Sequence, residues 1–526
     1  MAQDTYDYVI VGAGSAGAVL AARLSEDPGV TVLLLEAGGE ADADEVSMPV
    51  AFPTLFKTKW DWNYTTTGQK QLHGRRTYWP RMKALGGCSS MNAMIYIRGN
   101  RADYDGWRDQ HGATGWGYDD VLPYFVRAEA NTRLSAPYHG TDGPLHVEDR
   151  RYTHELSQAF VDSAVSWGLK PTDDFNGAEQ EGAGLYQVTC KAGRRWSTNE
   201  GYLKPVRDRA NLTVATNAFT TRVDLDGDRA TGVSFRQSAA EHSVTARREV
   251  LLCGGAVNSP QLLLLSGIGP AAHLRDVGVD VRVDLAGVGQ NLHDHPAVPY
   301  LWYTHDTTDL AGMSNLRNLV RWKARGTGPL ASNVGESGAF FSSREDLAAP
   351  DIQIHAAPSG FYDNGFQEPM SRMFTAAPTL VSVASRGALR LRSTDPAWHP
   401  ELEAAYFDDQ VDLDAMLAGS RMLREMCTQG PLAQFLGKPW RLPVDPSDEQ
   451  LVEHIRTYTQ TLYHPVGTCA MGSGEDAVVD PSLKVRGVEG LRVVDASVMP
   501  VVPRGNTNAP TIMVAEKAAD EIRKQS

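Results

Sequence analysis

A glycine-rich turn near the N-terminus constrains the fold of this chain more than any other feature. An apolar segment, Tyr6-Val11, predicts a β-strand, and Gly12-Ala-Gly-Ser-Ala-Gly17 follows it directly. The next residues predict a helix to about Ser25, and Val30-Glu36 predicts a second strand. The chain is therefore predicted to begin with a βαβ unit and to have an α/β fold.

The glycine turn predicts that this unit binds a dinucleotide. Glycines let the backbone approach a pyrophosphate, and the helix that follows offers unpaired N–H groups and a favourable dipole. Glu36, at the end of the second strand, is placed to accept hydrogen bonds from a ribose hydroxyl, and its charge would repel a 2′-phosphate. A tight turn without a ligand is the alternative, but it leaves the coincidence of strand, glycines, helix and acid unexplained. The motif itself does not distinguish NAD from FAD.

The composition is that of an ordinary globular protein and argues against several classes of partner. The 526 residues include 42% hydrophobic and 22% charged ones, and the length is sufficient for two domains. A formal net charge of -14 opposes binding to a phosphate backbone, so no nucleic acid is expected. No apolar run approaches the roughly 20 residues of a membrane-spanning helix. Five scattered cysteines without a C-x-x-C pair predict neither disulfides nor a metal site.

Motifs farther along the chain extend this interpretation. Residues 84–93, Ala-Leu-Gly-Gly-Cys-Ser-Ser-Met-Asn-Ala, form a run of small residues that lets the backbone pass close to a flat ligand. Residues 248–270 predict a strand, a glycine turn and a helix, and Tyr-His-Pro-Val-Gly-Thr at 463–468 precedes Asp495-Pro500 and Asn506-Thr511. In this order, the segments resemble the signatures and the C-terminal catalytic region of the glucose-methanol-choline (GMC) oxidoreductases. The resemblance spans the whole chain.

The resemblance implies a GMC fold, in which a Rossmann-like FAD-binding domain carries an inserted substrate domain of antiparallel sheet and helices. The FAD-binding domain would comprise residues 1–157, 199–296 and 462–526, and the substrate-binding domain residues 158–198 and 297–461. Residue patterns also predict strands at 211–216 and 248–253 and a helix start at 260–265. Further helices are predicted at 447–459, where Ser447 and Gln450 have capping-box spacing, and from about Pro510 to Ile522.

The resemblance also assigns residues to the cofactor. The first glycine turn would contact the pyrophosphate, Glu36 the adenosine ribose, and the backbone of Thr220 the adenine. Asn92 and Ala93 would lie near the reactive edge of the isoalloxazine ring. The helix near Pro510 would point its N-terminus at the pyrimidine end, where its dipole stabilises negative charge. The predicted cofactor-binding residues are Gly12, Gly14, Ser15, Ala16, Gly17, Glu36, Ala37, Gly86, Gly87, Ser90, Met91, Asn92, Ala93, Thr220, Gly254, Asp495, Ala496, Asn508 and Thr511, with Asp495 and Ala496 near the ribityl-pyrophosphate region.

The resemblance further predicts alcohol oxidation with His464 as the catalytic base. His464 matches the family's catalytic histidine, and Asn508 matches the partner that hydrogen-bonds the same substrate oxygen. A group with a pKa near neutrality suits removal of the hydroxyl proton while the α-hydrogen leaves as hydride to flavin N5. A lone histidine is more often structural, but the Tyr-His-Pro-Val-Gly-Thr and Asn-Ala-Pro-Thr motifs favour catalysis.

Two departures from the family pattern narrow the prediction. Members that bind FAD covalently carry a histidine after the Gly-Gly-Cys-Ser-Ser run, whereas this chain has Met91, so we predict non-covalent FAD. Choline-oxidising members carry a glutamate after the Asp-His-Pro motif, whereas this chain has Ala297, and a buried quaternary cation without a counter-charge is costly. We therefore predict a neutral, primary alcohol with an apolar or aromatic body as substrate. The predicted pocket residues are Trp62, Ala297, Leu462 and Tyr463, of which Trp62 and Tyr463 match aromatic positions of the choline-type pocket.

Two other groups of residues are interpreted as structural. His293 and His295 share a face of an extended stretch but have no third ligand in view, so no metal site is predicted there. Arg194-Arg195 and the pair Arg390 and Arg392 are short basic clusters of the kind usual on solvated surfaces.

Several alternatives stay open at this level. A flavin-dependent lyase or photodecarboxylase could use the same fold, although His464 with Asn508 keeps the redox pair. Choline oxidation, a catalytically silent FAD-stabilised binding protein and an NAD-dependent dehydrogenase are the others, and the last explains only the first motif. The electron acceptor, whether oxygen, a quinone or a cytochrome, is not determined, nor is a homodimer. With no signal-peptide pattern in the sequence, a cytoplasmic location is the expectation.

Overall fold

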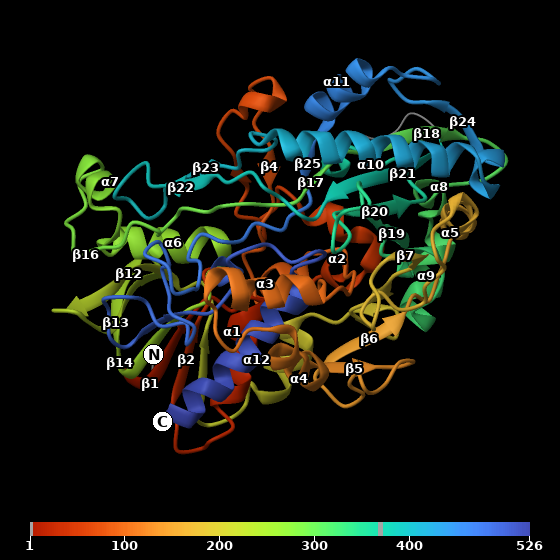
Figure 1. Cartoon of the computed structure of the whole chain (residues 1–526). Coiled ribbons are helices and arrows are strands. Elements are labelled where there is room, and N and C mark those ends of the chain that lie inside the picture. Colours follow the sequence, from red (N-terminus) through yellow and green to blue (C-terminus); the bar gives the residue numbers. More distant parts are fainter. Residues whose placement is uncertain (1–3, 367–371, 526) are drawn as a thin grey trace.

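Two large β-sheets and the helices around them form the structure (Figure 1). The computed structural model describes residues 4–366 and 372–525. The first sheet lies at the lower left of Figure 1, near both marked termini, and the second lies at the upper right. Each is built from segments distant in the sequence, so residues from both halves of the chain meet between them.

The first sheet has seven strands and is parallel around the glycine turn. Its order is β11-β2-β1-β14-β13-β12, with β26 beside β14. β1 pairs in parallel with β2 and β14, whereas β12, β13 and β14 form an antiparallel meander. The apolar run at the end of β1 is fully buried, as is typical of parallel strands. The strands are β1 (Thr5–Val11), β2 (Val32–Leu35), β11 (Leu212–Ala215), β12 (Phe219–Asp226), β13 (Arg229–Gln237), β14 (Ala240–Leu252) and β26 (Leu491–Val493).

The second sheet has eight strands, and its recorded pairings are antiparallel. Its order is β24-β18-β21-β20-β19-β7, with β17 paired to β21 and β25. Its strands come from residues 182–185 and 296–461, which closely follow the segments that the resemblance gives to the substrate domain. They are β7 (Gly182–Leu185), β17 (Pro296–Ala297), β18 (Tyr300–Thr304), β19 (Ser337–Phe341), β20 (Ile352–Ala357), β21 (Met373–Leu380), β24 (Leu436–Pro439) and β25 (Gln460–Thr461).

The helices near the site agree closely with the sequence patterns. α1 (Ser15–Leu24) follows β1 and packs against α12 (Asn508–Gln525), whose first turn contains the proline that helices tolerate there. α6 (Gly255–Leu265) begins earlier than predicted, directly at its glycine turn. α11 (Asp448–Tyr458) has the predicted capping box, because Ser447 Oγ accepts from Gln450 N and Gln450 Oε1 accepts from Ser447 N.

The remaining elements are short or peripheral. No helix within residues 4–366 and 372–525 is both long and apolar enough to span a bilayer. The other helices are α2 (Asp44–Ser47), α3 (Arg101–His111), α4 (Tyr118–Ala128), α5 (Glu155–Trp167), α7 (Ala271–Asp276), α8 (Leu310–Met313), α9 (Leu316–Arg325) and α10 (Gln410–Thr428). Small sheets contain β3 (Tyr64–Thr65), β4 (Tyr78–Trp79), β5 (Glu129–Asn131), β6 (Leu145–Asp149), β8 (Gln187–Val188), β9 (Cys190–Lys191), β10 (Arg194–Arg195), β15 (Ile268–Gly269), β16 (Val283–Asp284), β22 (Ala388–Arg390) and β23 (Glu401–Glu403).

Candidate active site

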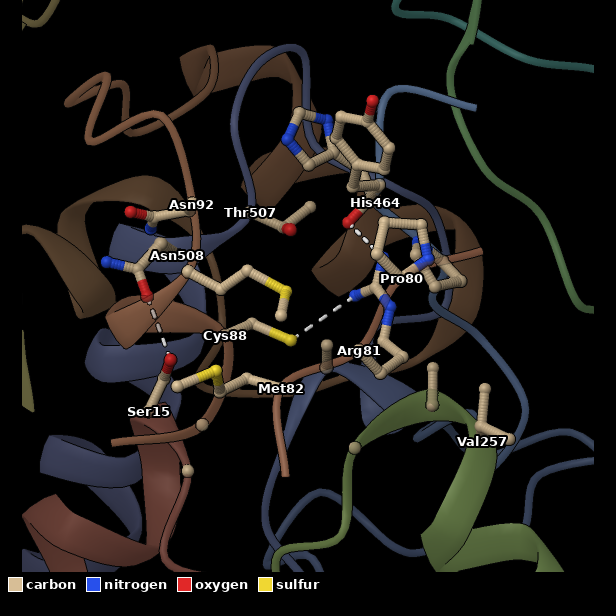
Figure 2. A pocket seen from close by; sticks show the side chains of 18 of the residues that line it. Ser15, Pro80, Arg81, Met82, Cys88, Asn92, Val257, His464, Thr507 and Asn508 are labelled. Carbon is tan, nitrogen blue, oxygen red and sulfur yellow. Dashed lines mark hydrogen bonds between the residues drawn. The ribbon is translucent and has the colours of Figure 1, made fainter. Parts of the chain in front are cut away.

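A cavity of about 310 Å³ extends from the glycine turn of the first sheet to the second sheet. Figure 2 shows side chains from both halves of the chain facing it, among them Ser15, Asn92, His464 and Asn508. Most of the predicted site residues line it. Three predicted site residues, Gly17, Gly86 and Ser90, do not line the cavity. The predicted residues that line it are Gly12, Gly14, Ser15, Ala16, Glu36, Ala37, Gly87, Met91, Asn92, Ala93, Thr220, Gly254, Asp495, Ala496, Asn508, Thr511, Trp62, Ala297, Leu462, Tyr463 and His464.

Close backbone contacts shape the nucleotide side of the cavity. Gly12 has φ +99°, and a Cβ there would lie 2.6 Å from the carbonyl oxygen of Cys253. Gly87 has φ +50°, and a Cβ there would lie 2.6 Å from Gly14 Cα. Both positions therefore require glycine. The two glycine turns lie close together, and their backbone faces the cavity without side chains.

Glu36 holds the glycine turn from the end of β2. Its Oε2 accepts from Ala13 N at 2.9 Å and its Oε1 from Gly38 N at 2.8 Å. Burial raises the pKa of Glu36 to about 7, and these two hydrogen bonds oppose that rise. Each carboxylate oxygen keeps a further lone pair, which leaves Glu36 able to accept a hydroxyl from a ligand.

The other predicted nucleotide contacts lie around the same end. Thr220, on β12, has a buried Oγ1 without a hydrogen-bond partner. Trp62 packs against the neighbouring Phe219 with ring centroids 6.0 Å apart, so its ring lies on the side of Thr220. Asp495 accepts from Gly255 N at 2.8 Å and thereby fixes the turn before α6. Trp62 lines the cavity beside Phe219, and its predicted contact with substrate stays a prediction.

Arg195 is the buried support of the loop that carries Asn92. Its Nη1 donates to Asn92 Oδ1 at 2.8 Å and to the Asn92 carbonyl at 2.6 Å, and its Nε donates to the Val46 carbonyl. The side chain is 3% exposed, so the solvated surface expected for Arg194-Arg195 is wrong for Arg195. The sequence pattern missed it because charge alone does not reveal that backbone carbonyls surround the guanidinium.

Two helices begin at the cavity and meet through their first residues. Asn508 Oδ1 accepts from Ser15 Oγ at 2.8 Å, which joins the N-terminus of α12 to that of α1. The unpaired N–H groups and the positive dipole ends of both helices are thus at the cavity. Such a pair of helix ends favours a ligand with negative charge at two places.

The asparagine beside His464 is Asn506, not the predicted Asn508. Asn506 Nδ2 lies 3.3 Å from His464 Nε2, and Asn506 Oδ1 accepts from Gln353 Nε2 at 3.3 Å. The contact from Gln353 orients the amide so that its N–H₂ faces the imidazole. Both asparagines belong to the same Asn-Thr-Asn motif and line the cavity, but the helix start at Asn508 turns that side chain to Ser15. The predicted contact of Asn508 with the substrate oxygen stays a prediction.

His464 is held from its ring and from its backbone. Its Nδ1 lies 3.0 Å from Nδ1 of His295, and its backbone N donates to Asp294 Oδ1 at 2.7 Å. Burial, with the neighbouring His295, His355 and Arg81, holds the pKa of His464 well below its ordinary value of 6.5. Burial also lowers the pKa of His295 to about 3. Both rings are therefore neutral at pH 7.

The contact between His464 and His295 fixes where the proton of His464 sits. Only one proton fits between two nitrogens 3.0 Å apart. Because the Asn506 amide faces Nε2 of His464 as a donor, the ring proton of His464 belongs on Nδ1, and the lone pair of Nε2 faces the Asn506 amide at the wall of the cavity. His295, interpreted from sequence as structural, is thus in direct contact with His464. No group of three or more metal-ligating side chains is found among the described residues.

The backbone before His464 is strained, and several hydrogen bonds hold it in place. Tyr463, the residue before His464, has φ +70°. Its N donates to Thr461 Oγ1 at 2.7 Å, its carbonyl accepts from Arg81 Nη2 at 2.5 Å, and its hydroxyl donates to Asn364 at 2.8 Å. Such strain persists only where surrounding contacts hold it, and it marks functional sites.

The side of the cavity near the second sheet is apolar. Phe52 and Phe361 have ring centroids 6.0 Å apart, and Phe56 and Tyr463 have centroids 5.7 Å apart. His355, on β20, also lines this side, and its buried Nε2 has no hydrogen-bond partner. Burial lowers the pKa of His355 to about 3, so it is neutral. Phe52, Phe56, Phe361 and His355 could not be identified from the sequence, since they lie outside the motifs.

Carboxylates are confined to the nucleotide side of the cavity. Among the described lining residues, the acids are Glu36 and Asp495. Ala297, on β17, is 1% exposed and lines the cavity at the position directly after the Asp-His-Pro motif. No other acidic side chain among the described residues lines the cavity, so none faces its interior on the aromatic side.

Comparison with known proteins assigns the chain to a family. The model of the N-terminal GMC oxidoreductase domain matches residues 6–297, and that of the C-terminal domain matches residues 383–515. The chain belongs to the GMC oxidoreductase family. It is 44% identical to the oxygen-dependent choline dehydrogenase of Paraburkholderia phymatum, over 99% of this chain and 93% of the relative. It is 41% identical to alcohol dehydrogenase [acceptor] of Pseudomonas putida, over 98% of this chain and 95% of the relative. The crystal structure of pyridoxine 4-oxidase from Mesorbium loti superposes with a TM-score of 0.91 at 30% identity, covering 99% of both chains.

The residues of this GMC oxidoreductase fit FAD. The bare backbone at Gly12 and Gly87, the two helix N-termini, the free lone pairs of Glu36 and the unpartnered Oγ1 of Thr220 are what a long, doubly charged dinucleotide would satisfy. The lining continues without interruption from these residues to His464, which accounts for the long shape of the cavity. The chain is an FAD-dependent oxidoreductase.

Proposed function

We propose that this protein oxidises a neutral primary alcohol to its aldehyde, with His464 as the base. The observation that carries the proposal is the neutral His464, whose Nε2 faces a cavity without a described carboxylate on its aromatic side. The names of two compared relatives, a choline dehydrogenase and an alcohol dehydrogenase, support alcohol oxidation in general. Bound FAD supplies the acceptor for the hydride that leaves the α-carbon.

The residues around His464 support the proton step. Nε2 takes the proton of the substrate hydroxyl, and the Asn506 amide donates to the same oxygen as negative charge grows on it. His355 Nε2 has no partner in the protein and is available to the same oxygen. His295 keeps the proton of His464 on Nδ1, so that Nε2 is always the acceptor before reaction.

The lining of the cavity supports an apolar or aromatic alcohol. Phe52, Phe56 and Phe361 provide apolar surface. A quaternary ammonium would lose its hydration here without gaining a counter-charge at Ala297. Arg81, the cation nearest His464 in the lining, would repel it further.

A panel of alcohols under anaerobic conditions tests the proposal. We expect neutral primary and benzylic alcohols to bleach the flavin absorbance and choline to leave it unchanged. We also expect Ala297→Glu to raise the ratio of kcat/KM for choline to that for the neutral alcohol by roughly tenfold, because the carboxylate compensates the cation. Ala297→Gln controls for side-chain volume and should not raise it.

Other outcomes of the panel would contradict the proposal in distinct ways. If choline bleached the wild type best, the substrate class would be wrong. If no alcohol bleached it while a chemical reductant did, the redox assignment would give way to lyase or photochemical activity. The rate of recovery on admitting air distinguishes oxygen from a quinone or other acceptor.

The pH dependence of kcat/KM follows from the neutral state of His464. Because burial lowers its pKa, the base form persists as pH falls, and activity is lost only when pH falls through that lowered pKa. We expect a level profile from alkaline pH down to about 6.5, the ordinary pKa of histidine. Steady-state rates across this range measure it, and an acidic limb centred above 6.5 would contradict the assignment.

We further propose that FAD is bound non-covalently, because Met91 lines the cavity where a histidine would make the bond. Acid precipitation of the yellow holoenzyme should leave the flavin in the supernatant, with a colourless pellet. Mass spectrometry of the intact denatured chain provides a second readout. A mass increment of one FAD on the polypeptide would disprove the proposal.

A further inference from the structure

We propose that α9 (Leu316–Arg325) docks this protein on the surface of an anionic phospholipid membrane. The helix reads Leu-Arg-Asn-Leu-Val-Arg-Trp-Lys-Ala-Arg and contains four basic residues and no acid. The whole chain has a formal net charge of -14, so this helix is a local exception to the charge of the molecule. Basic amphipathic helices with an exposed apolar stripe are typical of membrane surfaces.

The outer face of α9 carries apolar residues flanked by cations. Leu316 is 76% exposed and Val320 is 59% exposed, and both are among the large apolar side chains most open to solvent in the described residues. At about 100° per residue, Leu316, Val320 and Ala324 form one stripe. Arg317 and Arg321 follow along one side of it. Lys323 lies along the other side, where it pairs with Asp44, so the free positive charge borders the stripe on the side of the arginines.

The inner face anchors the helix firmly to the protein. Trp322 is fully buried, and its Nε1 donates to the Gly193 carbonyl at 2.9 Å. Arg194 lies over the Trp322 ring at 4.2 Å. Trp322 also belongs to an apolar cluster with Leu330. The exposure of the outer stripe is therefore not a result of loose packing.

The arginines of the outer face have no acidic partner. The recorded ion pair of α9 joins Lys323 to Asp44 at 2.7 Å, and among the described residues Arg317, Arg321 and Arg325 pair with no carboxylate. Unpaired cations beside an apolar stripe match a phosphate-rich surface above hydrocarbon, since each cation near such a surface adds to binding.

A basic cavity beside α9 continues the positive surface. This cavity of about 260 Å³ is lined by Lys191, Arg194, Arg195 and Lys204, and its carboxylate, Glu200, already pairs with Lys204 at 2.5 Å. Arg194 links it to the helix by donating to the Lys323 carbonyl at 3.2 Å. The cations of this cavity add to the positive potential around α9.

The docked face also lies close to the proposed active site. Met48 and Val50 pack with the cluster of Trp322, and Phe52 of the same short helix, η1 (Pro49–Leu55), lines the large cavity. Docking through α9 would thus bring the wall of the cavity near the lipid. The inference concerns binding alone and does not depend on the identity of the substrate.

Flotation of the FAD-loaded full chain with vesicles tests the inference. We expect binding to vesicles of equal parts phosphatidylcholine and phosphatidylglycerol and little binding to phosphatidylcholine alone, with a decline as salt increases. Arg317→Glu with Arg321→Glu should lower the bound fraction roughly tenfold or more. Leu316→Ser with Val320→Ser should also lower it.

Matched variants elsewhere on the surface provide the controls. Arg275→Glu with Arg282→Glu changes the net charge equally, at exposed residues near α7. Val411→Ser with Val444→Ser removes side chains that are 56% and 74% exposed. Both controls should bind like the wild type, and all four variants should keep flavin and alcohol activity in the absence of vesicles. Equal binding to neutral vesicles, equal losses in the controls, or binding to polyglutamate without binding to vesicles would overturn the inference.

Discussion

Replacing His464 by glutamine is expected to lower kcat/KM for the alcohol by roughly two to four orders of magnitude, the usual contribution of a positioned acid–base group. Glutamine can hold the hydroxyl in place but cannot accept its proton. Stopped-flow measurement of anaerobic flavin bleaching gives the rate directly. The flavin content of the purified variant shows whether the fold and cofactor site are intact.

His242→Gln is the matched control for this prediction. His242 is exposed on β14 and does not line the cavity, so its replacement should leave the bleaching rate unchanged. If the His464→Gln variant kept its flavin and bleached at the rate of the wild type, His464 would not be the base.

Asn506 and Asn508 should respond differently to replacement by alanine. Asn506→Ala removes the amide that faces His464 Nε2 and is expected to lower kcat about a hundredfold, as loss of one donor to a developing oxyanion does. Asn508→Ala removes the contact with Ser15 between two helix N-termini, so it is expected mainly to weaken retention of FAD. Bleaching rates and the dissociation of FAD measured by fluorescence distinguish the two effects.

One outcome for these two variants would contradict the roles expected for Asn506 and Asn508. If Asn508→Ala abolished bleaching while Asn506→Ala did not, the partner predicted from the sequence would be correct. The pairing read from the structure would then be wrong. Asn506→Asp adds a further check, because a carboxylate of similar size offers no N–H to the substrate oxygen.

The nucleotide half of the site was largely predictable from local sequence. A strand, a turn whose glycines are required by backbone contacts, a helix and Glu36 occur within a short stretch of chain, so their spacing is set by local geometry. The order of the later motifs gave the family, and the family comparison confirms it.

The part of the site near the second sheet could not be predicted from sequence motifs, because it depends on contacts between residues far apart in the chain. His355 reaches the cavity from β20, and His295 reaches His464 across a separation of 169 residues, because β17 and β25, which follow and precede these histidines, pair in the second sheet. Arg195 shows the same limit, since its burial against the Asn92 loop is a property of packing and not of its basic neighbour.

The sequence by itself determined the βαβ start, the GMC family and His464 as the candidate base, because each depends on residues that are adjacent in the chain. Only the tertiary structure decided that Asn506 faces His464, that His295 contacts the other ring nitrogen of His464 and that Arg195 is buried. The physical reason is that side-chain direction depends on where a helix or strand begins in space. Asn506 and Asn508 are two residues apart, yet the start of α12 directs one side chain to His464 and the other to Ser15.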